Sequence, residues 1–147
     1  MQVLTNVFDL WVFTRGKDGP RYLLLRTSQE KGDRFFGGGR FWQIPGELLE
    51  DDENVVAGIT RLLDEMGLWA QSVWAVEHVY PIYNRRRQGL ELIPVFAAEL
   101  AEEAQPALIW EHSEFGWFTA EECYERLTFR GLREGLDWTR HYISERA

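Results

Sequence analysis

The chain has 147 residues, of which 45% are hydrophobic and 14% aromatic, and its 16 basic and 24 acidic residues give a net charge of -8. This composition predicts one globular domain over residues 1–147 and excludes a disordered chain. The negative charge argues against a nucleic acid polymer as partner, because such proteins need a basic surface. A nucleotide ligand remains compatible, since a divalent metal can bridge carboxylates to phosphates.

The location is inferred from the N-terminus and from the cysteine count. Cys123 is the single cysteine, so an internal disulfide is excluded. Residues 1–13 lack the basic start of a signal peptide and contain Asp9. No apolar run approaches the roughly 18 residues that a membrane-spanning helix needs. We therefore expect a soluble cytoplasmic protein without a membrane partner.

The first part of the chain predicts a hairpin followed by a loop. Residues 3–14 and 21–27 are rich in β-branched and aromatic types and predict two strands, joined at Asp18-Gly19-Pro20. Residues 28–40 are rich in glycine and predict a flexible loop with a role over a ligand. Their GGG run is not a phosphate-binding loop, because no GK[ST] follows it. A short strand is expected over residues 41–45.

A periodic segment then predicts an amphipathic helix over about residues 54–66, ended by Gly67. Its apolar residues recur in steps of three and four, which places them on one face. These residues are Val55, Val56, Ile59, Leu62, Leu63 and Met66. The opposite face carries Ala57, Gly58, Arg61, Asp64 and Glu65.

The second half of the chain is interpreted as strands followed by helices. The expected elements are strands at 70–83, 89–100, 107–110 and 115–118, and helices at 120–127 and 131–145. Thr119 and Glu122 have the spacing of a capping box at the first of these helices. The order of all elements predicts an α/β (α+β) fold with a mixed sheet and helices on both faces.

Residues 45–68 resemble a degenerate Nudix box, the signature of the MutT-like Nudix hydrolases. The family pattern is G-x5-E-x7-R-E-U-x-E-E-x-G-U, where U is aliphatic. The resemblance implies a Nudix-type α/β/α sandwich around a central mixed sheet. It also implies that helix glutamates bind Mg²⁺ or Mn²⁺, which polarises a pyrophosphate and activates water, while the arginine orients a neighbouring glutamate.

Two alignments to this pattern are open. The preferred alignment is anchored at Gly67 and runs through the helix without a gap. It places Asp64 and Glu65 at the paired acids. The family arginine then becomes Thr60, and the first helix glutamate becomes Arg61.

The second alignment is anchored at Trp42-Gln43. It places Glu53 and Arg61 at the first acid and the arginine, and two metal-ligand positions become Leu62 and Met66. Under either alignment the box lacks at least one carboxylate that the family uses for metal.

Arg61 is the residue that departs most from a metal site. At a ligand position its positive charge weakens metal binding, or it contacts phosphate directly in place of the metal. The alternative is an ion pair with Asp64 and Glu65 on a solvated helix face.

The resemblance extends beyond the box. Residues 89–118 are similar to the dATP or dihydroneopterin triphosphate pyrophosphohydrolase subgroup, in which a loop glutamate helps to bind metal. That glutamate matches Glu111, and the last helix of the subgroup matches residues 131–145. His112 beside it is a candidate base, with a hydrogen-bonding role in the loop as the alternative.

Three residues are candidates for substrate contacts. Arg26 ends an apolar strand and is expected to contact phosphates, unless it forms a surface ion pair. Trp42 and Tyr83 are expected to stack on a base, with core packing as the alternative. The turn at Arg85-Arg86-Arg87 is interpreted as a solvated turn or as a contact for phosphates or a partner.

The resemblance implies a hydrolase that cleaves a pyrophosphate bond in a nucleoside diphosphate linked to another moiety. Glu65 and Arg61 are then the catalytic residues, and Asp64, Glu65, Glu111 and Glu53 hold Mg²⁺ or Mn²⁺. The alternative is a catalytically impaired Nudix-fold module that binds nucleotides or a partner. A homodimer formed through exposed aromatic residues is compatible with both.

Overall fold

A computed structural model describes residues 1–146, and within this range eight strands form one mixed sheet. The central strand order is β1-β7-β2-β3-β4, with β5 paired to β2, β6 to β7 and β8 to β3. The strands are β1 (Gln2–Leu4), β2 (Val7–Gly16), β3 (Gly19–Thr27), β4 (Trp42–Gln43), β5 (Gly46–Leu48), β6 (Ser72–Asn84), β7 (Gly89–Glu99) and β8 (His112–Phe118). β7 runs parallel to β1 and β2, and the other pairs are antiparallel.

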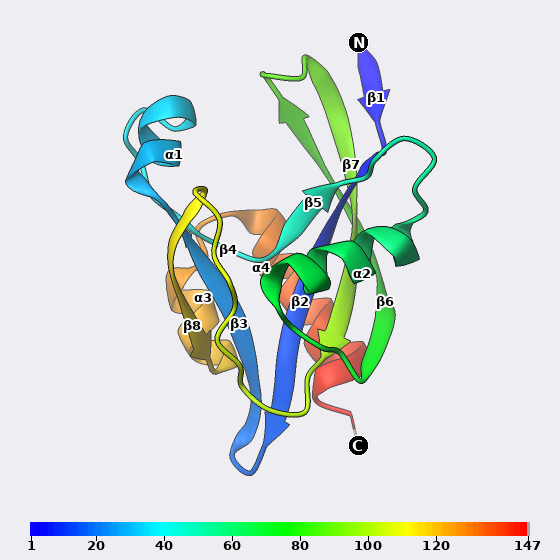
Figure 1. The fold of residues 1–147 in the computed structure, drawn as a ribbon, viewed down its shortest axis with the longest axis vertical. Helices are drawn as coiled ribbons and strands as arrows, with labels where there is room; N and C mark the ends of the chain where they lie inside the picture. The colour runs from blue at the N-terminus through cyan, green and yellow to red at the C-terminus, as the bar shows by residue number, and fades with distance from the viewer. Residues whose placement is uncertain (147) are drawn as a thin grey trace.

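Helices cover both faces of this sheet (Figure 1), as the element order predicts. They are α1 (Gln29–Phe35), α2 (Val55–Met66), α3 (Ala120–Arg126), α4 (Arg130–Thr139) and the π-helix η1 (Arg140–Ser144). Within residues 1–146, no helix has both the length and the apolar character needed to cross a membrane. The predicted α/β/α sandwich with a mixed sheet is confirmed.

The two core layers are separated by the alternation of side chains along β2. Phe8 and Leu10 face α2, whereas Trp11 and Phe13 face the layer of α3 and α4. All four are fully buried. Side chains alternate between sheet faces with a period of two, so a strand that is apolar at both parities must be covered on both sides.

Helix α2 forms where the periodic apolar pattern predicts it. The Asn54 side chain accepts a hydrogen bond from the Ala57 N–H (2.9 Å) and caps the first turn. Gly67 ends the helix in the left-handed conformation (φ 69°), which glycine adopts without steric cost. The apolar face of the helix packs on the sheet and fixes which polar residues of α2 point toward β5.

Residues 28–40 are a correction, because they contain α1 instead of a flexible loop alone. The Ser28 side chain accepts from the Lys31 N–H (3.1 Å) and caps this helix. The glycine run lies beyond the helix, where Gly37 and Gly38 have φ of 61° and 90°. The Gly38 N–H donates to the Gly32 carbonyl (2.9 Å), so the run folds back on α1.

Two predictions for the strands are also wrong. The strand over 3–14 is divided at residues 5–6, because β1 and β2 pair with different stretches of β7. Residues 107–110 form no strand, and the Ala107 N–H donates to the Met66 carbonyl of α2 (2.9 Å). The helix predicted over residues 131–145 is present as α4 and η1, with the change of helix type after Thr139.

Candidate active site

The candidate site begins at the close approach of β5 to β2. Asp9 pairs with Gly46, and the Leu10 N–H donates to the Pro45 carbonyl (2.8 Å). A Cβ at position 46 would lie 2.7 Å from Asp9 Oδ1 and 3.0 Å from the Phe8 carbonyl oxygen. Only glycine fits at such a distance. This contact places Glu47 and the acidic loop, residues 47–53, beside Arg61 of α2.

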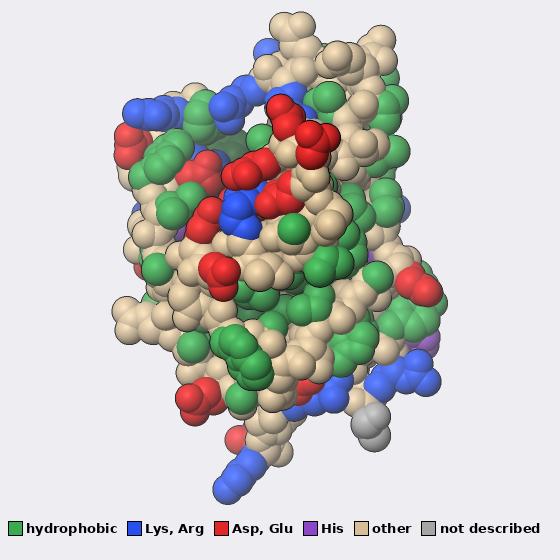
Figure 2. Space-filling model, turned by 45° about the vertical axis from the view of Figure 1, so that its right-hand side comes forward, with side chains coloured by type: hydrophobic (Ala, Val, Ile, Leu, Met, Phe, Trp, Pro, Cys, Tyr) green, Lys and Arg blue, Asp and Glu red, His purple; other side chains and the backbone are tan. Residues whose placement is uncertain are grey.

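Three carboxylates from three segments border one cavity of about 160 Å³. Glu47 comes from β5, Glu65 from α2, and Glu111 from the segment before β8. Leu62 and Met66 form part of its apolar lining. We call this cavity the acid pocket. Figure 2 shows acidic side chains gathered around one basic group on this face of the molecule.

Arg61 lies among these acids. Its guanidinium donates two hydrogen bonds to the Glu53 carboxylate (2.9 and 2.8 Å) and one to the Leu48 carbonyl (2.9 Å). Three further carboxylates lie near it: Glu65 at 3.4 Å, Glu50 at 3.5 Å and Glu47 at 3.8 Å. Arg61 therefore joins the acidic loop to α2 and neutralises part of the cluster.

The pKa values follow from this arrangement. The hydrogen bonds from Arg61 lower the pKa of Glu53 to about 2. Burial raises the pKa of Glu47 above its usual value, against the lowering by the Leu48 N–H and Arg61, and the charges of Glu65 and Glu111 raise it further. Glu53 thus stays ionised beside Arg61, whereas the ionised form of Glu47 is disfavoured and a further cation would stabilise it.

The two alignments of the Nudix-like segment can now be compared with contacts. Glu53 and Arg61 are paired, as the second alignment places the first acid and the arginine. Thr60, which the preferred alignment puts at the arginine, donates its hydroxyl to the Val56 carbonyl (3.0 Å). Leu62 is buried in the core. The contacts therefore favour the second alignment at the loop and at Arg61.

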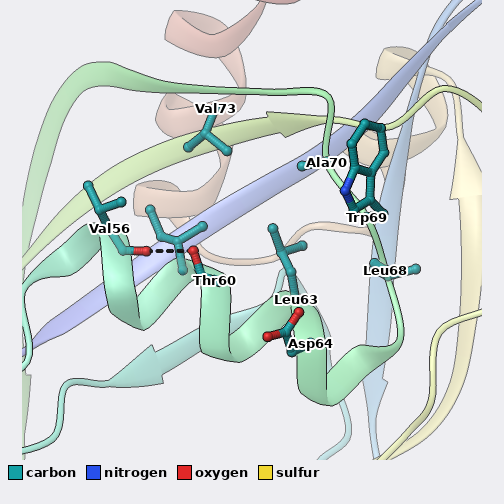
Figure 3. A pocket seen from close by; sticks show the side chains of 9 residues that line it. Val56, Thr60, Leu63, Asp64, Leu68, Trp69, Ala70 and Val73 are labelled. Atoms are coloured by element: carbon teal, nitrogen blue, oxygen red, sulfur yellow. Dashed lines mark hydrogen bonds between the residues drawn. The ribbon is translucent and has the colours of Figure 1, made fainter.

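Asp64 does not join the acid pocket. It borders a separate, largely apolar hollow of about 410 Å³ between α2 and β6 (Figure 3). Trp69, which is 74% exposed, lines the same hollow with Val56 and Val73. Successive helix residues differ by about 100° around the axis, so Asp64 and Glu65 cannot both face β5. The structure brings Glu65, Glu53 and Arg61 together and leaves Asp64 apart.

Glu111 is held in place from α1. Its carboxylate is 3.6 Å from the Lys31 ammonium, and its carbonyl accepts from the Ser28 N–H (2.8 Å). His112, the next residue, also lines the acid pocket. Burial, with the charge of Lys31, lowers the pKa of His112 to about 4. The imidazole is therefore neutral at neutral pH.

The predicted substrate residues lie outside the acid pocket. Arg26 forms an ion pair with Glu114 (3.1 Å), and its guanidinium lies 5.8 Å from the centre of a Trp42 ring. Trp42 packs against the α3–α4 layer, on the sheet face opposite to Leu25, which lines the pocket. Tyr83 is 53% exposed on β6. The structure thus brings Arg26 and Trp42 together, but not with Tyr83 or Glu65.

Two site residues were missed from the sequence. Glu47 follows Pro45-Gly46 directly, and this position was the signal that could have identified it. Lys31 has no such signal, because the glycine-rich sequence of residues 28–40 predicts a loop. It comes close to Glu111 only through the tertiary fold.

The side chains of the acid pocket are of the chemical type that binds a divalent cation. Glu47, Glu65 and Glu111 offer carboxylate oxygens, which Mg²⁺ and Mn²⁺ prefer. Within residues 1–146, no three Asp, Glu, His or Cys side chains are yet arranged as a metal site. A cation at this pocket would compete with Arg61 for Glu47 and Glu65.

Solved structures share this fold. A NUDIX hydrolase of Listeria monocytogenes superposes with a TM-score of 0.79 at 17% identity, covering 95% of this chain and 94% of that one. The NUDIX domain of Shewanella oneidensis NrtR, solved with ADP ribose, superposes with a TM-score of 0.73 at 18% identity. The superposition covers 97% of this chain and 90% of that one. The dihydroneopterin triphosphate pyrophosphohydrolase of E. coli superposes with a TM-score of 0.71 at 14% identity, covering 99% of this chain and 100% of that one.

A curated relative is an octanoyltransferase of Myxococcus xanthus, 31% identical over 116 residues, or 78% of this chain. The matched region is 30% of that protein, so the chain spans about a third of its length. The family model of the NUDIX domain matches residues 5–139. This match confirms the resemblance to the Nudix family that residues 45–68 indicate. The chain belongs to the NUDIX domain family.

Proposed function

We propose that this protein is a Nudix hydrolase that cleaves a pyrophosphate bond in a nucleoside diphosphate linked to another moiety, with Mg²⁺ or Mn²⁺ as cofactor. The observation that carries the proposal is the meeting of Glu47, Glu65 and Glu111 from three segments at one pocket. A nucleotide-type substrate agrees with the ADP ribose of the NrtR domain and with the triphosphate in the name of the E. coli enzyme.

Glu47, Glu65 and Glu111 would hold the cation at the acid pocket. When bound, a divalent ion polarises a phosphoryl oxygen and lowers the pKa of a water nucleophile. This assignment differs from the set inferred from the sequence, because Glu53 is committed to Arg61 and Asp64 lines another hollow.

The side chains of the pocket have distinct tasks in this proposal. The Glu65 carboxylate is half exposed and meets Arg61 only at 3.4 Å, so one of its oxygens is free to accept the proton of the attacking water. Arg61 is a positioning residue that keeps Glu47 of β5 close to Glu65 of α2. Leu62 and Met66 exclude bulk water from the inner wall, which strengthens the electrostatic interactions there.

A second candidate function is a nucleotide-binding or interaction module without hydrolysis. Leu62 favours it, because the second alignment places a metal ligand at this position and the structure has a buried apolar side chain there. The positive charge of Arg61 among the acids also favours the module without hydrolysis, because it weakens the binding of a metal cation.

A matched pair of variants separates the two candidates. The release of phosphate or pyrophosphate is measured from a panel of nucleoside triphosphates and nucleotide sugars with Mg²⁺ and with Mn²⁺. We expect Glu65→Gln to lower metal-dependent turnover roughly 100-fold or more, and Asp64→Asn, the same kind of change one residue away, to leave it within about twofold. Equal turnover in both variants contradicts the proposed site. No turnover, with a nucleotide that still raises the melting temperature, supports the binding module.

Three expectations from the sequence remain proposals. They are a single domain over residues 1–147, a cytoplasmic location, and a homodimer formed through exposed aromatic residues. Size-exclusion chromatography with light scattering measures the last of these directly.

A further inference from the structure

The helix α1 and the β6–β7 turn, residues 84–88, meet at one end of the molecule. The Arg86 guanidinium lies 3.8 Å from the centre of the Phe35 ring, which joins the turn to α1. Figure 1 shows the tip of the β6–β7 hairpin directed toward α1. We call α1 and this turn the basic arch. Its two halves are about 50 residues apart in the sequence, and neither belongs to the Nudix-like segment.

The basic arch borders the acid pocket. The Arg34 guanidinium lies 5.0 Å from a Trp110 ring, and the Lys31 ammonium lies 3.6 Å from Glu111. Trp110 and Glu111 both line the pocket. On the same face, Figure 2 shows Lys and Arg side chains along the upper edge of a hollow, with the acidic side chains below. Cations and carboxylates therefore face a common space.

Two arginines of the arch have no carboxylate partner among the described residues. Within residues 1–146, Arg85 and Arg86 form no ion pair, whereas Arg87 is paired with Glu91. The Asn84 side chain accepts from the backbone N–H groups of Arg86 and Arg87 (3.0 and 3.2 Å), which fixes the shape of the turn. Unpaired arginines are notable on a chain with a net charge of -8.

Guanidinium groups that are free of carboxylates and braced by aromatic rings are suited to phosphate oxygens. Their planar forks donate two parallel hydrogen bonds to an oxyanion, and less side-chain freedom is lost when a ring already holds the group. Phe35 provides this bracing for Arg86. Trp110, whose ring centre is 6.5 Å from that of Phe35, lies against Arg34, which is also paired with Glu30 (2.9 Å). A neutral sugar at this position would leave Arg85 and Arg86 without a counter-charge.

We propose that the basic arch binds the phosphates beyond the bond that is cleaved, and that the substrate is a nucleotide with a chain of three or more phosphates. Arg85 and Arg86 hold the far end of this chain, while the acid pocket holds the phosphates that react. The inference rests on the proposed function and specifies its substrate class. Arg85 and Arg86 are then specificity-determining residues, since a nucleotide sugar does not use them.

The binding step is tested without metal, so that it does not depend on hydrolysis. Inorganic tripolyphosphate is titrated in a buffer with EDTA into the wild type, Arg85→Ala, Arg85→Ala/Arg86→Ala and the control Lys17→Ala/Arg130→Ala. The control removes two exposed charges away from the arch, one in the β2–β3 turn and one on α4. We expect the arch double variant to bind about tenfold or more weakly, and the control to bind like the wild type. Equal affinity in the arch double variant and the wild type overturns the inference.

Arg85→Ala covers the case in which the double variant folds poorly. Within the described residues Arg85 has no ion pair or side-chain hydrogen bond, so its loss should leave the melting temperature unchanged and still weaken tripolyphosphate binding. An unaltered affinity in a fully folded Arg85→Ala/Arg86→Ala protein excludes the arch as the phosphate site.

Steady-state kinetics separates this inference from the proposed function. With a nucleoside triphosphate, the arch double variant should raise KM about tenfold and leave kcat unchanged, while KM for a nucleotide sugar stays constant. Weakened tripolyphosphate binding without hydrolysis of any substrate would support the arch and reject the hydrolase. Hydrolysis by the arch variant with KM values for both substrates unchanged from those of the wild type would support the hydrolase and reject the arch.

Discussion

The Arg61 guanidinium holds the Glu53 carboxylate through two hydrogen bonds, of 2.9 and 2.8 Å, across the junction between the acidic loop and α2. The same guanidinium donates to the Leu48 carbonyl, so it fixes both ends of the loop. The protein thus supplies a cation of its own where the acids converge. The loop is folded by an arginine, and a divalent cation has to compete with it.

Arg61→Ala should therefore lower the melting temperature and increase the response to metal. Without Arg61, Glu47, Glu50, Glu53 and Glu65 repel one another, and we expect a drop of about 2–4 °C in EDTA. Mg²⁺ or Mn²⁺ should then raise the melting temperature by more than in the wild type, because the acids gain a cation. Scanning calorimetry with and without metal measures both effects.

Arg61→Lys is the control for charge, since it keeps the cation but loses the fork that holds Glu53. Its melting temperature should lie between those of Arg61→Ala and the wild type. A metal response in Arg61→Ala that equals that of the wild type would contradict the competition between Arg61 and the cation.

Asp9 should make stability depend on pH. It is buried beside β5 and accepts a hydrogen bond from the Tyr80 hydroxyl. Burial raises its pKa to about 7, against the lowering by Tyr80. The folded pKa is above the unfolded pKa, so the fold favours the protonated acid. Its stabilising effect is complete below about pH 4 and is lost as the pH rises to about 7.

Asp9→Asn should remove this dependence. Between about pH 5 and pH 8 the wild type should lose of order 2–3 kcal/mol of unfolding free energy relative to Asp9→Asn. Tyr80→Phe removes the hydrogen bond that favours the ionised acid, so it should steepen the loss. Urea unfolding across this pH range measures both slopes. Parallel profiles for Asp9→Asn and the wild type would show that Asp9 does not titrate differently in the folded state.

Gly131→Ala should destabilise the contact between α4 and β6. A Cβ at position 131 would lie 2.3 Å from Tyr80 Cδ2, so the Tyr80 ring or the helix must move. We expect a cost of about 1–3 kcal/mol, although alanine is the better helix former. Chemical denaturation gives the value. Glu134→Ala, at a partly exposed position of α4 where the side chain pairs with Arg130, is the control, and a change in Gly131→Ala no larger than in this control would refute the steric account.

Thr119→Ala should remove the cap of α3. The Thr119 hydroxyl accepts from the Glu122 N–H (3.3 Å), and the Glu122 carboxylate accepts from the Thr119 N–H (2.9 Å), as the predicted capping box requires. Loss of the hydroxyl should cost about 1 kcal/mol in thermal or urea unfolding. Thr119→Ser keeps an acceptor oxygen and should retain most of the stability. Equal losses in both variants would assign the effect to the methyl group of Thr119.

Local patterns in the sequence were sufficient for several elements. The periodic apolar residues and Gly67 predict α2 to within one residue, and Thr119 with Glu122 predicts the start of α3. The same reasoning missed α1, because seven residues with a single capping serine carry too little periodicity beside a glycine run. It also missed the break between β1 and β2, which depends on pairing with β7.

The sequence by itself determined the Nudix-like segment, its acids and the helix that carries Glu65. Only the tertiary structure decided which acids meet. Asp64 and Glu65 are adjacent, yet the packing of α2 on the sheet turns one to an apolar hollow and the other to β5. Glu111 reaches the pocket from a distant segment, and Arg86 reaches Phe35 from another. Local patterns report helix periods and turns, whereas these contacts depend on how the helix is rotated on the sheet and on which distant segments pack beside it.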